Sequence, residues 1–136
     1  MVMTVSILLF DSRTLGAIDN ALSVDSKLEK SRSRQLCCAV CRFPITQYAH
    51  AIKIEQKHIH LKCNPGGSLF LIGCYRNASG CGHFGEFTYE YTWFNGYKWC
   101  NALCSSCNTQ LGWCFAGEQT FYGLILEQLV DCKIDN

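Results

Sequence analysis

Two cysteine pairs of the form C-x-x-C constrain this chain more than any other feature. They are Cys38 with Cys41 and Cys104 with Cys107. Each such turn aims two thiolates at one ion, and two turns complete a tetrahedral zinc site. Because the pairs lie far apart in the sequence, the metal would hold distant parts of one domain together. Four thiolates leave no open coordination position, so we expect structural Zn²⁺ at these four residues. Disulfides or a redox pair are the alternative.

The composition is that of one ordinary globular domain. The chain has 136 residues, of which 49% are hydrophobic and 17% charged, and a chain of this length can bury an adequate core. The formal net charge of +1 gives no electrostatic argument for nucleic acid or an anionic membrane. No apolar run is long enough to span a membrane. We therefore expect no nucleic-acid partner, no membrane partner and a monomer.

Seven of the 11 cysteines remain outside the proposed zinc set. They are Cys37, Cys63, Cys74, Cys81, Cys100, Cys114 and Cys132. An odd number cannot all pair within one chain. Cys74 and Cys81 flank a glycine-containing loop and could close a disulfide there. Cys100 and Cys114 could be cross-strand neighbours on an outer face, or ordinary buried thiols.

All three tryptophans fall between residues 87 and 115. In residues 87–93 an aromatic side chain occupies every second position, which predicts a strand with four aromatics on one face. Turn residues follow, and the alternation resumes at Trp99 and again at Trp113 and Phe115. Three strands would then direct the indoles toward one place. We expect an aromatic cage, with a buried core as the alternative.

The ligand of such a cage should be a flat or small neutral ring with polar edges. A cage for an ammonium group usually gains from a nearby carboxylate. Glu90 has the opposite parity to Tyr91 and Trp93 and is expected to point away.

The remaining folded part reads as short strands. Strands are predicted at 51–55, 58–61, 70–74 and 121–130, with a turn at 64–67, although 124–130 alone could be a helix. His58 and His60 share a strand face and could bind a metal, although solvated strand histidines are commoner.

The N-terminal part is expected to lie outside the domain. Residues 2–10, V-M-T-V-S-I-L-L-F, could be the core of a secretory signal, or else an N-terminal extension or strand. Residues 18–35 read as a polar tether with at most a short helix near 21–30. We expect the domain over 36–132 and a tail at 133–136. Asn77-Ala78-Ser79 is an N-glycosylation acceptor pattern that matters only in a secreted protein.

Several motifs between Leu36 and Leu126 carry a resemblance to a known family. They are L-C-C-A-V-C, Asn64-Pro65, E-Y-T-W-F-N-G-Y-K-W, C-S-S-C, Q-L-G-W-C-F and F-Y-G-L. This stretch resembles the CULT domain family, which includes the thalidomide-binding domain of cereblon and single-domain bacterial and secreted animal proteins. The resemblance implies an all-β β-tent, with two antiparallel sheets set at a steep angle and pinned by a four-cysteine zinc site.

The resemblance also implies a ligand class and its contacts. Family members bind cyclic imides such as glutarimides, and uracil-like rings, inside three indoles. The matching positions here are Trp93, Trp99 and Trp113, with Phe115 at the base, Asn64 at the rim, and the backbone of Tyr91 and Trp93 at the imide edge. Tyr91 stands where cereblon has histidine. The ligand would be a small metabolite, a nucleoside or a cyclised terminus of another protein.

Other classes of function remain as alternatives. The additional cysteines, the apolar start and the glycosylation pattern favour the secreted branch of the family over a cytoplasmic setting. Methionine sulfoxide reductases of the B type share the fold and the zinc, but they need a nucleophilic cysteine in a setting that we do not find around Cys114 or Cys132. We therefore expect a binding domain and no enzyme. A purely structural or protein-interaction domain is the third possibility.

Overall fold

The computed structural model describes residues 34–132. The expected signal segment, the tether helix and the C-terminal tail lie outside these residues. The described part contains nine strands and two short 3₁₀ helices. The strands are β1 Gln35–Cys38, β2 Pro44–Gln47, β3 Ile59–Cys63, β4 Leu69–Tyr75, β5 Cys81–Thr88, β6 Lys98–Cys104, β7 Gln110–Ala116, β8 Thr120–Ile125 and β9 Leu129–Asp131; the helices are η1 Tyr48–His50 and η2 Leu126–Gln128. Within this part no helix has the length and apolar character needed to cross a membrane.

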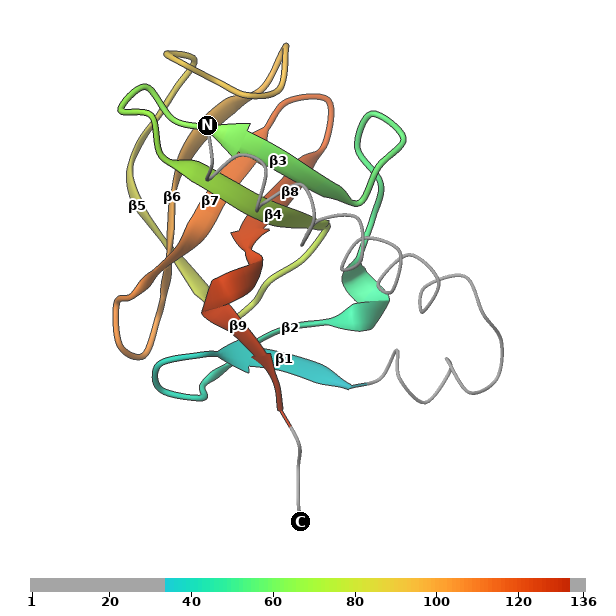
Figure 1. The fold of residues 1–136 in the computed structure, drawn as a ribbon, viewed down its shortest axis with the longest axis vertical. Helices are drawn as coiled ribbons and strands as arrows, with labels where there is room; N and C mark the ends of the chain where they lie inside the picture. The colour runs from blue at the N-terminus through green and yellow to red at the C-terminus, as the bar shows by residue number, and fades with distance from the viewer. Residues whose placement is uncertain (1–33, 133–136) are drawn as a thin grey trace, which may run out of the picture.

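The strands form two antiparallel sheets, which confirms the expected all-β class. The small sheet has the order β2-β1-β9, and the large sheet has the order β3-β4-β8-β7-β6-β5. Figure 1 shows the small sheet at the foot of the large one, with β9 returning to pair with β1. The two ends of the described chain therefore meet in the small sheet.

The large sheet carries a hydrophobic cluster on each face. Trp99 pairs with Phe115, and Phe115 with Phe121, whereas Cys100 pairs with Cys114, and Cys114 with Tyr122. Successive residues of a strand point to opposite faces, so the two series lie on different sides. One cluster comprises Ile54, Ile72, Cys74, Phe94, Phe115, Phe121 and Ile125. The other comprises Leu36, Cys38, Ile45, Tyr75, Ala78, Cys104, Leu111 and Leu124, and so includes residues of the small sheet.

Gly80 joins the two sheets through its backbone. It lies between β4 and β5, and its N–H donates to the carbonyl of Ile45 in β2 (3.1 Å). Its carbonyl accepts from the N–H of Ser105 (3.0 Å) and from the Ser105 hydroxyl (2.8 Å). One peptide segment therefore links the small sheet to the second cysteine turn.

The β3–β4 hairpin follows the sequence prediction, but the segment before it does not. The turn at 64–67 is present, and the N–H of Ser68 donates to Oδ1 of Asn64 (2.8 Å). Residues 51–55 form no strand; Ala51 and Ile54 make only isolated bridges. Glu55 and Gln56 have φ of 53° and 70°, and this left-handed backbone reverses the chain where the strand was predicted to continue.

The predicted strand at 121–130 is two strands. β8 ends at Ile125 in the large sheet, the single turn of η2 follows, and β9 belongs to the small sheet. An apolar run cannot reveal such a crossing, because both strands are partly buried.

Both predictions for His58 and His60 are wrong. The two side chains are buried rather than solvated. Nδ1 of His58 donates to the carbonyl of Ile52 (3.0 Å), and Nε2 of His60 donates to the carbonyl of Lys57 (3.0 Å). Among residues 34–132 the only cluster able to hold a metal is the four-cysteine one. Both imidazoles thus hydrogen-bond to the connecting loop, and burial lowers the pKa of His60.

One disulfide is present among the described residues, between Cys37 and Cys132. The two Cα atoms lie 5.5 Å apart, within the usual range for such a bond. It ties β1 to the end of β9. The predicted Cys74–Cys81 disulfide is wrong: both residues are free thiols, and they pack in clusters on opposite faces of the large sheet.

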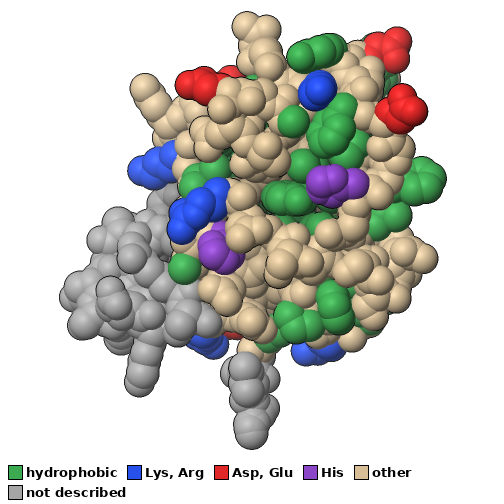
Figure 2. Space-filling model, turned by 180° about the vertical axis from the view of Figure 1, so that it is seen from behind, with side chains coloured by type: hydrophobic (Ala, Val, Ile, Leu, Met, Phe, Trp, Pro, Cys, Tyr) green, Lys and Arg blue, Asp and Glu red, His purple; other side chains and the backbone are tan. Residues whose placement is uncertain are grey.

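Strand β5 forms an exposed edge of the large sheet. Phe84 and Phe87 are exposed, and the ring of His83 contacts the ring of Phe87 with centroids 6.1 Å apart. The view from behind shows hydrophobic side chains and histidine at the surface (Figure 2). The register shifts between Phe84 and Thr88, and such a bulge discourages edge-to-edge pairing.

Candidate functional site

The four cysteines of the two C-x-x-C turns meet in one cluster. All four Sγ atoms lie within 4.8 Å of one another. Sγ of Cys38 is 3.7 Å from that of Cys107, and Sγ of Cys41 is 3.6 Å from that of Cys104. Tetrahedral Zn²⁺ with bonds of about 2.3 Å would place its sulfurs about 3.8 Å apart. The residues present therefore fit a zinc ion, and the alternative of disulfides at these positions does not hold.

The two cysteine pairs lie in two separate backbone turns of the same type. The N–H of Arg42 donates to the carbonyl of Cys38 (2.8 Å), and the N–H of Asn108 donates to the carbonyl of Cys104 (2.8 Å). Arg42 and Asn108 both have φ of 66°. The repeated left-handed residue closes each turn just after its second cysteine, so both turns present their thiols in the same way.

Hydrogen bonds and burial shift the pKa values of two of the four cysteines in opposite directions. A hydrogen bond from the Thr109 hydroxyl, 3.0 Å from Sγ, lowers the pKa of Cys107 to about 6. Burial raises the pKa of Cys104 to about 11. A bound cation favours the thiolate form of all four ligands, and Cys107 reaches that form more readily than Cys104.

An aromatic cavity of about 300 Å³ lies elsewhere on the large sheet. The residues lining this aromatic cavity are Asn64, Pro65, Phe70, Tyr91, Trp93, Trp99, Asn101, Gln110, Trp113 and Phe115. All six residues named from the sequence as ligand-binding line it: Asn64, Tyr91, Trp93, Trp99, Trp113 and Phe115. Four lining residues were missed: Pro65, Phe70, Asn101 and Gln110. Asn101 has the same strand parity as Trp99, and that signal could have found it.

The indoles pack edge to face around the aromatic cavity. The ring centroids of Trp93 and Trp113 are 4.7 Å apart at an interplanar angle of 74°, and those of Phe70 and Trp113 are 5.2 Å apart at 73°. The indole N–H of Trp93 donates to the carbonyl of Cys63 (2.9 Å), and that of Trp99 to the carbonyl of Glu90 (2.8 Å). All three indoles are only partly buried. Aromatic faces therefore remain available to a ligand.

The predicted strand through Tyr91 and Trp93 is wrong. β5 ends at Thr88, and Tyr91 has φ of 59°, a left-handed conformation outside the β region. Tyr91 is 67% exposed and borders the aromatic cavity from a loop. The N–H and C=O of Tyr91 and the N–H of Trp93 make no hydrogen bond to any other residue within 34–132. Three backbone polar groups are thus left for solvent or a ligand.

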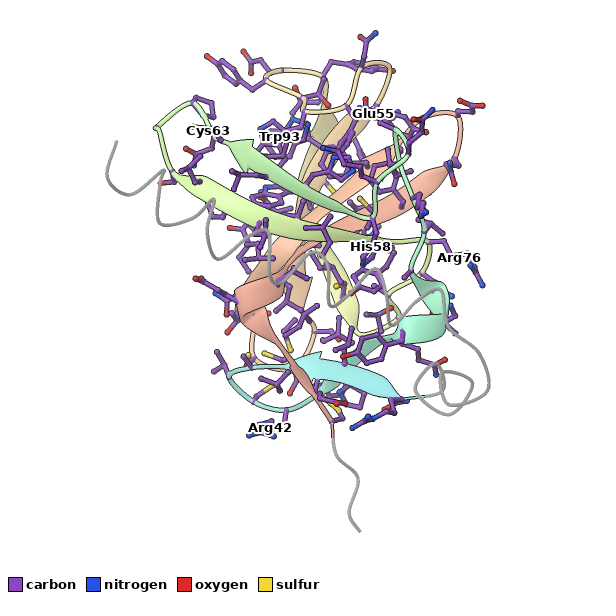
Figure 3. All side chains as sticks on the ribbon, turned by 45° about the vertical axis from the view of Figure 1, so that its right-hand side comes forward. Arg42, Glu55, His58, Cys63, Arg76 and Trp93 are labelled. Carbon is purple, nitrogen blue, oxygen red and sulfur yellow. A yellow bond between two sulfur atoms is a disulfide. The ribbon has the colours of Figure 1, made fainter. Side chains whose placement is uncertain are left out.

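The cysteine cluster and the aromatic cavity lie at opposite ends of the molecule. Figure 3 shows Trp93 beside Cys63 at one end and Arg42, which follows the first cysteine turn, at the other. Trp99 and Cys104 are five residues apart on β6, or roughly 17 Å at 3.4 Å per residue. A metal at the cluster therefore cannot touch a ligand in the aromatic cavity, and its effect there is through the strands.

Cys100 and Cys114 are cross-strand neighbours, as predicted. Both are free thiols and both are buried rather than on an exposed face. Burial raises the pKa of Cys114 to about 11 and also raises that of Cys100. Cys74 and Cys81 have pKa values raised by burial to about 12. Cys63, by contrast, is an exposed thiol at the end of β3.

We expect Cys63 to be the one rapidly reacting thiol of the zinc-loaded, oxidised domain. At pH 8, a pKa near 12 leaves a thiolate fraction roughly a thousand times lower than that of an ordinary cysteine. Labelling with iodoacetamide followed by peptide mass spectrometry should modify Cys63 at least about a hundredfold faster than Cys74 or Cys81. Cys63→Ser should remove the fast phase and Cys74→Ser should not; fast labelling of a buried thiol in folded protein contradicts the expectation.

Fold and site together define a class of protein: an all-β domain of two antiparallel sheets, with a four-cysteine cluster suited to zinc and a separate aromatic cavity. No protein-family model matches the chain. Curated proteins, however, match it in sequence. Cereblon of Drosophila yakuba is 30% identical over 116 residues, which is 75% of this chain and 20% of that protein. Cereblon of Drosophila persimilis is 37% identical over 96 residues, which is 64% of this chain and 16% of that protein.

The chain thus carries a cereblon-like domain of the CULT type, at modest identity to its relatives. Cereblon of Drosophila pseudoobscura pseudoobscura also matches, at 37% identity over 96 residues. The chain spans about a fifth or less of the length of these curated relatives.

Proposed function

We propose that the aromatic cavity binds cyclic imides of the glutarimide type, or uracil-like rings, without catalysing a reaction. The observation that carries the proposal is the set of unpaired backbone groups of Tyr91 and Trp93 beside a cavity with three indoles in its walls. The resemblance to CULT domains supports the same ligand class.

The chemistry of an imide suits these groups. An imide offers one N–H donor flanked by two carbonyl acceptors. The carbonyl of Tyr91 would accept from the imide N–H, and the N–H of Trp93 would donate to one imide oxygen. The indole faces would cover the flat or puckered ring and exclude water, which strengthens both hydrogen bonds.

The composition of the lining favours a neutral ligand. Of the residues around the aromatic cavity, none is Asp, Glu, Lys, Arg or His. A charged ligand would lose hydration there without gaining a counter-ion. An imide or a uracil ring is neutral at pH 7 and loses only hydrogen bonds that the backbone can replace.

A zinc ion at the four cysteines would support this cavity from a distance. The second cysteine turn joins β6 and β7, and these strands carry Trp99 and Trp113. Structural zinc would supply a four-way crosslink and no open coordination position. The cysteines would thereby hold the β6–β7 hairpin, and with it the indoles, in a fixed register.

The reductase alternative has no observation in its favour. Of the two cysteines considered for it, Cys114 is buried with a raised pKa, and Cys132 is disulfide-bonded. A reactive cysteine needs access and a lowered pKa. The partial exposure of the indoles also favours a binding site over a purely structural core.

Titration of the zinc-loaded protein with thalidomide and with uridine tests the proposal. We expect a saturable change of tryptophan fluorescence, with calorimetry giving the same dissociation constant. Trp99→Ala should weaken binding about 10- to 100-fold, since the lost apolar contact is worth roughly 1.5–3 kcal/mol. Tyr89→Ala is the matched control, because Tyr89 is exposed and does not line the aromatic cavity.

N-methylated thalidomide provides the ligand control. The methyl group removes the imide N–H and should abolish binding if the carbonyl of Tyr91 accepts from it. No change in fluorescence or heat with either unmodified ligand would refute the proposed function.

A further inference from the structure

Two side-chain amides form the polar part of the aromatic cavity. Asn101 lies on β6 opposite Trp113, and Gln110 begins β7 opposite Leu103. Both line the aromatic cavity. Nε2 of Gln110 donates to Oδ1 of Asn101 (2.9 Å) and to the carbonyl of Gly112 (3.3 Å). The amides therefore form one hydrogen-bonded pair, which we call the Asn101–Gln110 pair.

The hydrogen bonds within the Asn101–Gln110 pair determine which of its donors and acceptors remain without a partner. A primary amide has two N–H donors and one carbonyl acceptor. Both acceptors of the Gln110 nitrogen are oxygens, so its orientation is set and its two hydrogens are used. Oε1 of Gln110 and Nδ2 of Asn101 have no partner among residues 34–132. One acceptor and two donors thus remain at the wall of an otherwise largely aromatic site.

A substituent that extends from a bound ring toward the solvent would meet these groups. Asn101 is half-buried and Gln110 is exposed, so the Asn101–Gln110 pair reaches from the cavity wall to the solvent. Without a ligand, solvent water can hydrogen-bond to these amides. A ligand that covers them without replacing those hydrogen bonds loses affinity, and one that replaces them keeps it.

We propose that the Asn101–Gln110 pair selects ring ligands that carry a polar substituent offering both an acceptor and a donor. The acceptor of the substituent would accept a hydrogen bond from Nδ2–H of Asn101, and its donor would donate one to Oε1 of Gln110. An acylamino group on an imide ring and the hydroxyls of a nucleoside sugar share this chemistry, whereas an aryl or unsubstituted ring lacks it. The inference rests on the proposed function, because the ring itself must enter the aromatic cavity.

Two ligand pairs measured by calorimetry on the full chain test this selection. One pair is glutarimide and 3-acetamidoglutarimide, and the other is uracil and uridine. We expect the substituted member of at least one pair to bind about tenfold tighter, and the pair that shows the preference identifies the source of the substituent. Asn101→Leu and Gln110→Ala should each bring the ratio of the two affinities near one, whatever their effect on the affinity for the bare ring.

The outcomes separate the inference from the proposed function. The role of the Asn101–Gln110 pair is overturned if bare rings bind but substituted rings bind no more tightly. It is also overturned if the preference for substituted rings survives both substitutions. In either case the proposed function still stands. Failure of all four ligands to bind overturns both. Because Gln110 is exposed, Gln110→Ala keeps the test available if Asn101→Leu does not fold, and tryptophan fluorescence and zinc content check each variant.

Discussion

Replacing Cys104 with serine is expected to leave the chain without a stable fold. Cys104 ends β6 and shares its cluster with Cys38, which ends β1. Structural zinc contributes about 10–16 kcal/mol in zinc-finger peptides, whereas the whole stability of a domain is about 5–15 kcal/mol. Loss of one ligand also leaves a buried polar group without its partner. Circular dichroism and metal analysis should show loss of the cooperative thermal transition together with loss of one zinc per chain.

Cys63→Ser is the matched control for this substitution. It also exchanges one thiol for a hydroxyl, but at an exposed free cysteine outside the cluster, so the melting temperature and zinc content should not change. A chelator should reproduce the effect of Cys104→Ser in the unmodified protein. Chelated protein that unfolds at the same temperature as the zinc-loaded protein would rule out a structural metal.

Gly80→Ala is expected to destabilise the domain by about 3–5 kcal/mol. A Cβ at this position would lie 2.6 Å from Cα of Ile45 and would collide with the carbonyl oxygen of Pro44. The backbone cannot move aside easily, because hydrogen bonds to Ile45 and Ser105 hold both sides of Gly80. Urea unfolding followed by fluorescence should show a lower midpoint.

Gly66→Ala is the control for the glycine substitution. The nearest atom to a Cβ there is Oδ1 of Asn64, at 3.5 Å, which is an ordinary contact. We expect a change within about 1 kcal/mol. If the two substitutions have equal effects, the backbone at Gly80 can move aside and the junction is not rigid.

The parts of the site that follow from local pattern could be predicted from the sequence. A C-x-x-C pair carries its own turn, so the cluster of Cys38, Cys41, Cys104 and Cys107 needed only the inference that two turns meet. The placement of Trp99, Trp113 and Phe115 followed from strand parity. Asn101 obeys the same parity but was overlooked, since a lone asparagine on a strand has no distinctive pattern.

Tyr91 and Trp93 line the aromatic cavity from a loop, so strand parity does not explain their position. The left-handed backbone at Tyr91 takes the chain out of β5. The carbonyl of Glu90, the residue before it, accepts a hydrogen bond from the indole N–H of Trp99. The indole N–H of Trp93 donates to the carbonyl of Cys63. These bonds connect residues that come together only in the folded molecule, so alternation of residue types predicted the place but not the conformation.

The disulfide and the buried histidines depend on contacts between distant segments. Nothing local distinguishes Cys37 and Cys132 from the other unassigned cysteines; the pairing of β1 with β9 does. His58 is fixed by a carbonyl of the preceding loop. The strand predicted for that loop does not form, because Glu55 and Gln56 adopt a left-handed backbone that the sequence does not mark with glycine.

The neighbouring cysteines of β1 make the sulfur chemistry sensitive to strand register. Cys37 forms the disulfide with Cys132, and Cys38 belongs to the metal cluster. A slip of β1 by one residue exchanges the faces of its side chains. In one direction it would bring Cys38 to the place of Cys37, beside Cys132, and in the other it would bring Cys37 to the place of Cys38, beside the metal site. An oxidant acting on such a slipped chain would lock the error covalently. Metal binding is reversible and would reject the wrong register first, so binding of zinc before oxidation would protect this fold.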